Sequence, residues 1–374
     1  MELSSIISQI AETQLEAVRS DGSVPSGHNG LYRDDETPVR NSSHWLLTFS
    51  LLYESTGDRR FQEAAKRVSE YLNTSDARPG EHTFFHRKVT DKDRCNGLIG
   101  QAWTIEGLAV AAHVLGDSAL GDLAKDVFLL HSQDRRTGLW KRVEVDGQTL
   151  PFDATFNHQL WFGAAGAILA DLPWTSERVD DRVRRFLDEL ETNLRLYPSG
   201  LIFHPLKPDS TRRRLHLVRA DERGRIGLTF LTSSVPLPSR RRQLEWKAIG
   251  YHAFNLYAFA LLKRQYPDHE FWETEKWQRA LEYVRTDEYR ENVWQNEYGS
   301  PYNPVGFEVP FAMEVFDIGT LEERRHWITK QFERHYNPET NRLDRNTEDP
   351  ETLTARIYQA TRLENISLPE FEPQ

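Results

Sequence analysis

The chain has 374 residues, of which 38% are hydrophobic and 28% are charged. This composition provides enough apolar material for a large core and leaves open whether the chain forms one large domain or two. The formal net charge of −10 argues against a general surface for nucleic acid or for an anionic membrane, because both require a basic face. Cys95 is the only cysteine, which excludes an internal disulfide and a zinc site built from cysteines.

Targeting and membrane segments are not evident in the sequence. The stretch 1–22 lacks a charged region followed by an apolar one, which a secretory signal would require. No later segment approaches the length of a membrane span. We therefore expect a cytoplasmic protein that is not inserted in a membrane and has no nucleic-acid partner.

Two classes of predicted helix alternate along the chain. Helices of the first class are amphipathic with charged faces, which is typical of surface helices; they cover 2–19, 58–74, 118–131, 175–196, 270–285 and 320–335. Helices of the second class are apolar or small on nearly every side, which predicts burial; they cover 44–56, 98–115, 155–170, 244–264, 305–316 and 352–363. Pairing each surface helix with the buried helix after it gives six hairpins, with a repeat of roughly fifty to sixty residues.

The connections between these helices differ in length. A buried helix is followed by a short turn, such as 115–117 or 266–269, whereas the links into the buried helices are long and polar, as in 21–44, 77–97 and 136–154. This pattern predicts an all-α, (α/α)6 barrel over residues 1–374, with the buried helices as an inner ring. The long loops then gather where the inner helices begin, so we expect the functional site at that end. The free N–H groups and dipoles of the inner helices favour an anion there.

One insertion interrupts the repeat, at residues 205–242. Alternating apolar positions in "RLHLVR" (214–219) and "IGLTFLT" (226–232) predict a β-hairpin, and a short strand is also expected near 139–147. The insertion concentrates arginines. It is either a solvated charge run or a lid over a polyanionic sugar chain, since the planar guanidinium binds carboxylates with two hydrogen bonds.

Polar side chains recur at the starts of the predicted inner helices. Any one of them could be a helix cap or a satisfied core group, and Glu106, two turns inside its helix, could simply tie inner helices together. As a set they predict a polar cleft. The candidates are Arg40, His44, Gln101, Glu106, Asp153, Asn157, His158, Tyr251, His252, Glu308 and Arg356. Trp140, in the cleft-side stretch "TGLWKR", is a candidate for stacking on a sugar ring or for plain packing.

The six hairpins resemble the six-hairpin glycosidase superfamily of (α/α)6 barrels, which includes unsaturated-uronyl hydrolases and sugar 2-epimerases, with uronate polysaccharide lyases among related toroids. The resemblance covers essentially the whole chain. Four stretches are more narrowly similar to the AglQ-type proteins of archaeal surface-glycosylation gene clusters: "RDDETPVRNSSHWLLTF", "KDRCNGLIGQAWTIEGLAVAA", "DATFNHQLWFGAAG" and "EWKAIGYHAFNLYAFALL". This resemblance implies a partner glycan rich in uronic acid, and therefore anionic.

Two dipeptides on successive inner helices, Asn157-His158 and Tyr251-His252, are similar to the Asn-His and Tyr-His pairs of alginate-lyase-like enzymes. Removing the C5 proton of a uronic acid requires an amide and a cation to neutralise the carboxylate, a His or Tyr base and a Tyr acid. The arginine that those lyases place two turns before the tyrosine falls here at Leu244, so Lys247 or the arginines at 240–242 would replace it. This interpretation, a lyase or a C5-epimerase, assigns substrate binding to Arg40, His44, Gln101, Trp140, Lys247, Glu308 and Arg356.

Two other functions remain open at this point. Glu106 and Asp153 could be the acid and base of an inverting glycoside hydrolase, which needs two separated carboxyl groups. A non-catalytic glycan-binding barrel is the second. The sequence contains no HExxH, Walker A, GxGxxG or GxSxG motif, and His82 and His86 have no evident third ligand, so no metal or cofactor is expected.

Overall fold

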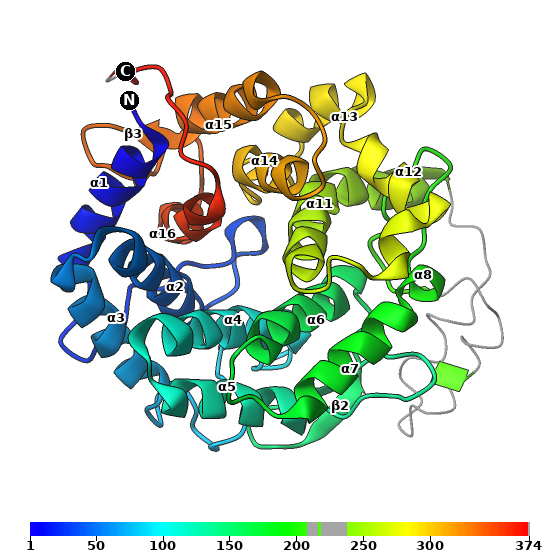
Figure 1. The fold of residues 1–374 in the computed structure, drawn as a ribbon, viewed down its shortest axis with the longest axis horizontal. Helices are drawn as coiled ribbons and strands as arrows, with labels where there is room; N and C mark the ends of the chain where they lie inside the picture. Colours follow the sequence, from blue (N-terminus) through cyan, green and yellow to red (C-terminus); the bar gives the residue numbers. More distant parts are fainter. Residues whose placement is uncertain (208–215, 218–237, 373–374) are drawn as a thin grey trace.

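The computed structural model describes residues 1–207, 216–217 and 238–372. Within these residues, helices form an inner ring surrounded by an outer ring (Figure 1). The inner ring comprises α2 (Val39–Thr56), α4 (Gly97–Leu115), α6 (Phe156–Ala170), α11 (Pro238–Gln265), α14 (Val305–Val315) and α16 (Pro350–Ala355), which the 3₁₀-helix η4 (Arg356–Arg362) continues. Neighbouring inner helices contact each other from α2 to α14, and η4 contacts both α14 and α2, so the ring is closed.

The outer ring comprises α1 (Leu3–Leu15), α3 (Arg59–Leu72), α5 (Ser118–Leu130), α7 (Glu177–Asp188), α12 (Glu275–Tyr283) and α15 (Leu321–His335). The remaining elements are short: η1 (Gly30–Tyr32), α8 (Leu190–Asn193), η2 (Glu270–Glu273), α13 (Asp287–Asn292) and η3 (Val293–Gln295). Strands β1 (Lys141–Val143) and β2 (Thr149–Phe152) form an antiparallel hairpin that pairs Lys141 with Phe152, and β3 (Tyr336–Asn337) pairs with β4 (Arg342–Leu343). The predicted all-α (α/α)6 architecture is confirmed.

Several predicted boundaries are corrected by the structure. The inner helix α2 begins at Val39 rather than at 44, because Arg40 and the residues after it are buried as part of the helix. Residues 238–242, which the sequence assigned to the insertion, are the first turn of α11. The predicted β-hairpin at 214–232 lies outside the described residues apart from His216 and Leu217.

Helix α4 corrects the expectation that no segment approaches a membrane span. Gly97–Leu115 is 19 residues long and apolar enough to cross a membrane by length and composition. However, 78% of its apolar window is buried inside the protein, and α4 contacts both of its inner neighbours, α2 and α6. Its apolar surface therefore belongs to the core.

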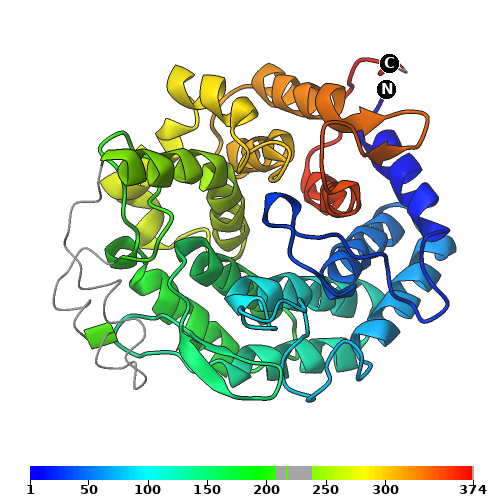
Figure 2. The ribbon, with the colours of Figure 1, turned by 180° about the vertical axis from the view of Figure 1, so that it is seen from behind.

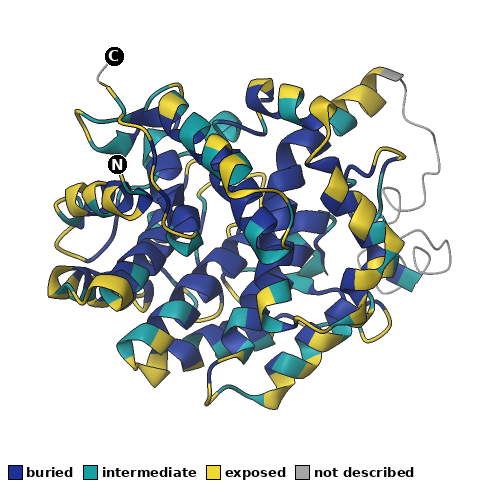
Figure 3. Ribbon diagram, turned by 45° about the horizontal axis from the view of Figure 1, so that its top comes forward, coloured by how far each residue is buried: buried dark blue, intermediate teal, exposed yellow. Residues whose placement is uncertain are grey.

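The two classes of helix differ in how they are buried (Figure 3), and they also differ in how they begin. Outer helices bury one stripe, as α7 does with Val179, Val183 and Phe186, whereas α4 is buried along most of its length. Side chains cap the amino ends of the outer helices α3, α5, α7, α12 and α15. The inner helices α2, α4, α6 and α14 begin at residues whose own side chains form no cap, so their amino ends are left for other groups to satisfy.

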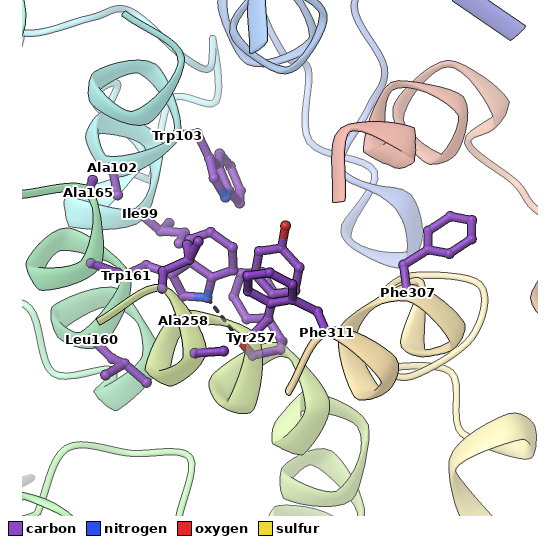
Figure 4. Packing of buried hydrophobic residues seen from close by; sticks show 14 of the residues in the cluster. Ile99, Ala102, Trp103, Leu160, Trp161, Ala165, Tyr257, Ala258, Phe307 and Phe311 are labelled. Carbon is purple, nitrogen blue, oxygen red and sulfur yellow. Dashed lines mark hydrogen bonds between the residues drawn. The ribbon is translucent and has the colours of Figure 1, made fainter. Parts of the chain in front are cut away.

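Aromatic stacking joins α6, α11 and α14 in the core (Figure 4). The ring of Trp161 lies 4.5 Å from that of Phe254 and 5.7 Å from that of Tyr257, and its Nε1 donates a 3.1 Å hydrogen bond to the carbonyl of Phe254. Tyr257 in turn stacks on Phe311 at 4.4 Å. Such offset ring pairs add to the burial of apolar area, so this column fixes the spacing of three inner helices.

The only cysteine lies in the loop before α4 and is buried. Its Sγ donates to Asp93 Oδ1 at 3.4 Å. Burial and the negative charge of Asp93 raise the pKa of the Cys95 thiol well above its ordinary value. The thiol is therefore protonated at neutral pH.

Gly107 sets the approach of α4 to α2, because a Cβ at this position would lie 2.7 Å from the carbonyl oxygen of Ser43. We expect Gly107→Ala to lower the free energy of unfolding by about 1–3 kcal/mol, since the methyl group must displace backbone. Urea unfolding measures this change. Glu63→Ala, on the exposed side of α3, serves as the control and should leave the midpoint unchanged. Equal midpoints for both variants would contradict the close helix contact.

Candidate active site

A pocket with a volume of about 200 Å³ opens at the amino ends of the inner helices, comparable to one monosaccharide unit. We call it the central pocket. The segment before α2, which contains η1, reaches toward the centre of the ring on this face (Figure 2). The lining residues are Asn29, Tyr32, Asp34, Arg87, Lys92, Asn96, Ile99, Trp103, Thr155, Asn157, His158, His204, Lys247, Tyr251, Phe254, Tyr302, Asn303 and Arg356. Most come from the long loops and the helix starts, as the loop lengths predict, whereas Lys247, Tyr251 and Phe254 lie in the middle of α11.

Asp153 orients His158 at the start of α6. The distance from Asp153 Oδ2 to His158 Nδ1 is 2.8 Å, and the same oxygen accepts from the N–H of Leu98 at 3.0 Å. Burial alone would raise the pKa of Asp153, but His158, Arg142 and the Leu98 amide outweigh it and hold the pKa well below its ordinary value. The carboxylate therefore keeps the proton of neutral His158 on Nδ1. Nε2 of His158 forms no hydrogen bond within the described part of the chain and is free to accept a proton.

Gly97 makes room for this pair. Its φ of +60° is in the left-handed region, and a Cβ there would lie 2.5 Å from Asp153 Oδ2 and 3.1 Å from His158 Nδ1. Glycine is thus required both by the backbone conformation and by the close approach. The sequence stretch "CNGL" at the start of α4 is the local signal for it.

Three side chains that line the central pocket carry buried polar atoms without a hydrogen-bond partner among the described residues. These atoms are Oδ1 of Asn157, Nε1 of Trp103 and Nδ1 of His204. Asn157 is 2% exposed.

A cluster of tyrosines surrounds the ammonium group of Lys247. Its Nζ lies 5.4 Å from the ring centres of Tyr32 and Tyr298 and 5.5 Å from that of Tyr251. Such contacts stabilise a cation, although burial lowers the pKa of Lys247. The hydroxyls of Tyr32 and Tyr251 are 3.0 Å apart, and burial raises the pKa of Tyr251 well above its ordinary value. No carboxylate of the described residues pairs with Lys247.

Arg356 brings a second cation to the pocket wall from η4. Its Nη2 donates to Glu308 Oε1 at 2.7 Å, and its Nε donates to Gln359 at 3.0 Å. Burial raises the pKa of Glu308 to about 7, and Arg356 and Gln359 offset only part of that rise. Glu308 itself does not line the pocket, so it positions Arg356.

Three further predicted residues support the pocket from behind. Arg40 donates to Asn29 Oδ1 at 3.0 Å and to Glu36 Oε1 at 3.1 Å, and its guanidinium lies 4.3 Å from the Trp103 ring centre. Gln101 ties the long loop to α4 through both backbone groups of Phe84 and the carbonyl of Cys95, and His44 stacks on Tyr358 at 4.5 Å. These contacts are with protein groups, so the structure places all three beneath the pocket wall.

Two predicted site residues belong to the core instead. Trp140 is fully buried, with its ring centre 5.3 Å from that of Phe162 and 5.0 Å from that of Phe186, so it presents no face to a sugar. His252 accepts from the N–H of Ile202 at 3.4 Å, and its Nε2 lies 3.0 Å from the carbonyl of Ala280. Both of its nitrogens are occupied by backbone groups.

Glu106 also lies away from the pocket. Its Oε1 accepts from Arg362 Nη1 at 2.6 Å in a buried ion pair that ties α4 to η4. This is the structural alternative that the sequence left open. Glu106 and Asp153 do not face each other across the central pocket.

Sequence reasoning missed several lining residues, notably Tyr32, His204, Tyr302 and Lys92. His204 packs against Tyr251 with ring centres 4.5 Å apart, and burial lowers its pKa well below the ordinary value. Tyr32 ends the short 3₁₀-helix η1, and the other three lie in connections between helices. The long-loop pattern pointed to these segments, but loops have no period from which an inward-facing residue can be identified.

No family model matches the chain. Among solved structures, a D-mannose isomerase aligns with a TM-score of 0.63 at 12% identity, covering 96% of this chain and 97% of the other. An inactive variant of the α-1,6-mannanase GH76A of Salegentibacter sp. HEL1_6 aligns with a TM-score of 0.58 at 11% identity, covering 96% and 98%. The architecture is that of the six-hairpin glycosidase-like (α/α)6 barrels.

The sequence comparison is more specific. The chain is 46% identical over 367 residues to archaeal glycosylation protein Q of Haloferax volcanii, and the alignment covers 98% of both proteins. The chain therefore belongs to the family of archaeal glycosylation protein Q.

Buried histidines make stability depend on pH. Burial lowers the pKa of His252 to about 3, so the folded protein keeps this imidazole neutral where the unfolded chain, near 6.5, binds a proton. The unfolded state then binds more protons, and stability falls as the pH falls below 6.5.

We expect His252→Gln to reduce the slope of the free energy of unfolding against pH by about 1.4 kcal/mol per pH unit. Urea unfolding between pH 7.5 and 5 measures this slope. Subtracting the slope of His252→Gln from that of the wild type cancels the groups that both proteins share. One of these is Glu308, whose raised pKa makes stability rise as the pH falls. Identical slopes would contradict the neutral buried state.

Proposed function

We propose that this protein is a carbohydrate-active enzyme that removes the C5 proton of a uronic acid unit in a glycan, as a lyase or a C5-epimerase. One observation carries the proposal: His158, oriented by Asp153, shares a pocket with Lys247, a cation without a carboxylate partner among the described residues. A glycan substrate agrees with membership in a family whose characterised relative is named for archaeal glycosylation.

The pocket residues divide the chemistry between them. The ammonium of Lys247 and the amide of Asn157 receive the carboxylate of the uronate, and its neutralisation makes the C5 proton more acidic. Nε2 of His158 takes that proton. The raised pKa of Tyr251 keeps its hydroxyl protonated, and Tyr251 therefore serves as the acid.

The fate of the C5 electron pair decides between the two reactions. In elimination, the pair forms a C4=C5 double bond, the C4–O bond breaks, and Tyr251 gives its proton to the departing oxygen. In epimerisation, a proton is delivered to the opposite face of C5 and no bond between sugars breaks. In epimerisation Tyr251 is also the proton donor to C5, and in either reaction His158 then releases its proton to solvent while Tyr251 takes one up.

The carboxylates of the site favour proton transfer over hydrolysis. Among the described lining residues of the central pocket, Asp34 is the one carboxylate, and it pairs with Lys92 at 2.5 Å and Arg87 at 3.7 Å. An inverting hydrolase needs two carboxyl groups on opposite sides of the bond. A simple binding barrel would not need an imidazole whose proton is fixed by a buried carboxylate.

Incubation with uronate-containing oligosaccharides tests the proposal directly. An unsaturated uronide, seen by its ultraviolet absorbance, is expected for elimination, and solvent deuterium at C5 without cleavage is expected for epimerisation. New reducing ends without either signal would contradict C5 proton abstraction and would support hydrolysis.

His158→Ala should reduce turnover by about 10²–10⁴-fold, as expected for a lost acid–base group. Its melting temperature should change little, because the His158 side chain is 26% exposed and is bound to the protein at Nδ1 alone. His252→Ala is the matched control: it should melt early, since it leaves two buried backbone groups unpaired at about 1–3 kcal/mol. A His158→Ala protein that melts early yet keeps its specific activity would show that His158 has a structural role and not a catalytic one.

A further inference from the structure

Arg356 has no role in the proposed chemistry, although it lines the central pocket. Its guanidinium lies 5.2 Å from the ring centre of Phe254. The Phe254 ring lies 6.1 Å from that of Tyr251, whose centre is 5.5 Å from Lys247 Nζ. The two cations therefore belong to one wall of the pocket. They differ in their partners, because Arg356 pairs with Glu308 whereas Lys247 has no carboxylate partner among the described residues.

The carboxyl group of Glu308 is held from one side. Its Oε1 accepts from Arg356 Nη2 at 2.7 Å and from Gln359 Nε2 at 3.2 Å, whereas its Oε2 is buried and has no hydrogen-bond partner in the described part of the chain. Asp153, by contrast, accepts hydrogen bonds on both of its oxygens. Because hydrogen bonds stabilise a buried carboxylate as an anion, Glu308 is held less firmly in its charged form than Asp153.

The surroundings of Glu308 provide one cation. Within the described residues, the charged or titratable groups that act on it are Arg356, from η4, and Tyr289, from α13. Tyr289 is buried, and burial together with the charge of Glu308 raises the pKa of its hydroxyl well above the ordinary value. Burial raises the pKa of Glu308 to about 7, against the effect of Arg356. Its charged and protonated forms are therefore both populated at neutral pH.

A uronate in the central pocket would place a second carboxylate beside the same wall. Arg356 would then lie between the sugar, in the pocket, and Glu308, which does not line it. Two carboxylates near one buried cation raise each other's pKa, so that one of them takes up a proton. Lys247 and Asn157 hold the carboxylate of the sugar in the proposed function, which leaves Glu308 as the group that is protonated.

We propose that Glu308 takes up a proton from solvent when a uronate enters the central pocket, so that Arg356 exchanges an internal carboxylate for that of the substrate. The proposal rests on the proposed function for the anionic character of the ligand. The proton goes to Oε2, the oxygen that accepts no hydrogen bond from the described residues. Because the complex binds more protons than the free protein, the affinity for a uronate rises as the pH falls.

Calorimetry with glucuronate as the probe measures this exchange on the full chain. Titrations at pH 7.5 in two buffers of different ionisation enthalpy count the protons taken up for each ligand bound, and we expect about half a proton. The dissociation constant should also rise about three- to fivefold between pH 7 and pH 8. The absence of proton uptake, or of glucuronate binding, would overturn the proposal.

Glu308→Gln removes the titrating group and keeps an oxygen that can accept from Arg356. We expect this variant to lose the proton uptake and to bind glucuronate about five- to tenfold more tightly than the wild type at pH 8, because it imitates the protonated form. A Glu308 that only holds Arg356 in place predicts the opposite result, which is weaker binding with the proton uptake retained.

Glu106→Gln is the matched control. Glu106 also forms a buried pair, at 2.6 Å from Arg362, but neither residue is among the described residues that line the central pocket. Its proton uptake and its affinity for glucuronate should equal those of the wild type. The same change in both variants would overturn the proposal, because the effect would then not depend on the pocket.

Two further variants assign the proton if Glu308→Gln does not fold. His158→Ala and Lys247→Arg each remove a titrating group that lines the pocket, and the proton uptake should survive in both. Loss of the uptake in either variant would overturn the proposal, because the proton would then belong to that side chain.

This inference and the proposed function fail in different ways. Glucuronate binding with the expected proton uptake, but without turnover of uronates, would keep the exchange and remove the chemistry. Turnover of uronates with equal proton uptake in the wild type and in Glu308→Gln would keep the chemistry and remove the exchange.

Discussion

The carboxylate of Asp153 joins the inner ring to the catalytic candidate. It accepts from the N–H of Leu98 at the start of α4, from the N–H of Thr155 before α6, and from His158 within α6. Helix α4 has no side-chain cap of its own, since it begins after Asn96 in a left-handed conformation. A charged group from the neighbouring hairpin thus supplies the cap that α4 lacks. The same negative charge fixes the imidazole, so the stability of this junction and the geometry of the site depend on one side chain.

The two-ring architecture explains why such a group lies in a pocket at all. The outer helices α3, α5, α7, α12 and α15 carry their own side-chain caps. Inner helices without caps turn their amino ends toward long polar loops, and those loops supply the partners. Asp93 acts in the same way on Gly97, at 2.7 Å. The loops must therefore bring carboxylates and amides close to the axis of the barrel, where a substrate can meet them.

Much of the fold was predictable from the sequence, because its signal is periodic. The inner helices α4 and α6 begin and end within a residue of the predicted bounds, since their apolar character stops abruptly at polar loops. Asn157 and His158 were predictable as well, as polar residues at the first turn of an apolar helix. Helix α2 was harder: its first turn contains polar residues that are buried by contacts with the irregular loop just before it, and those contacts leave no periodic pattern.

The site residues that were placed wrongly share a physical reason. Tyr251 and His252 are consecutive in the middle of a helix, and consecutive helical residues point to different faces, so the pocket receives Tyr251 and the core receives His252. Trp140 stands in a loop, where neighbouring residues do not determine whether a ring turns inward. Tyr32 and His204 reach the pocket from irregular segments for the same reason, and only the assembled barrel brings them beside Tyr251.

The buried thiol of Cys95 has a practical consequence. It is held against Asp93 and stays protonated, whereas thiol reagents attack the exposed thiolate. A cysteine introduced at the surface can therefore be labelled selectively with the native residue left in place. Pairs of spin or fluorescent labels on the loops around the barrel mouth would then report distances between these loops in the unaltered chain, with and without a glycan.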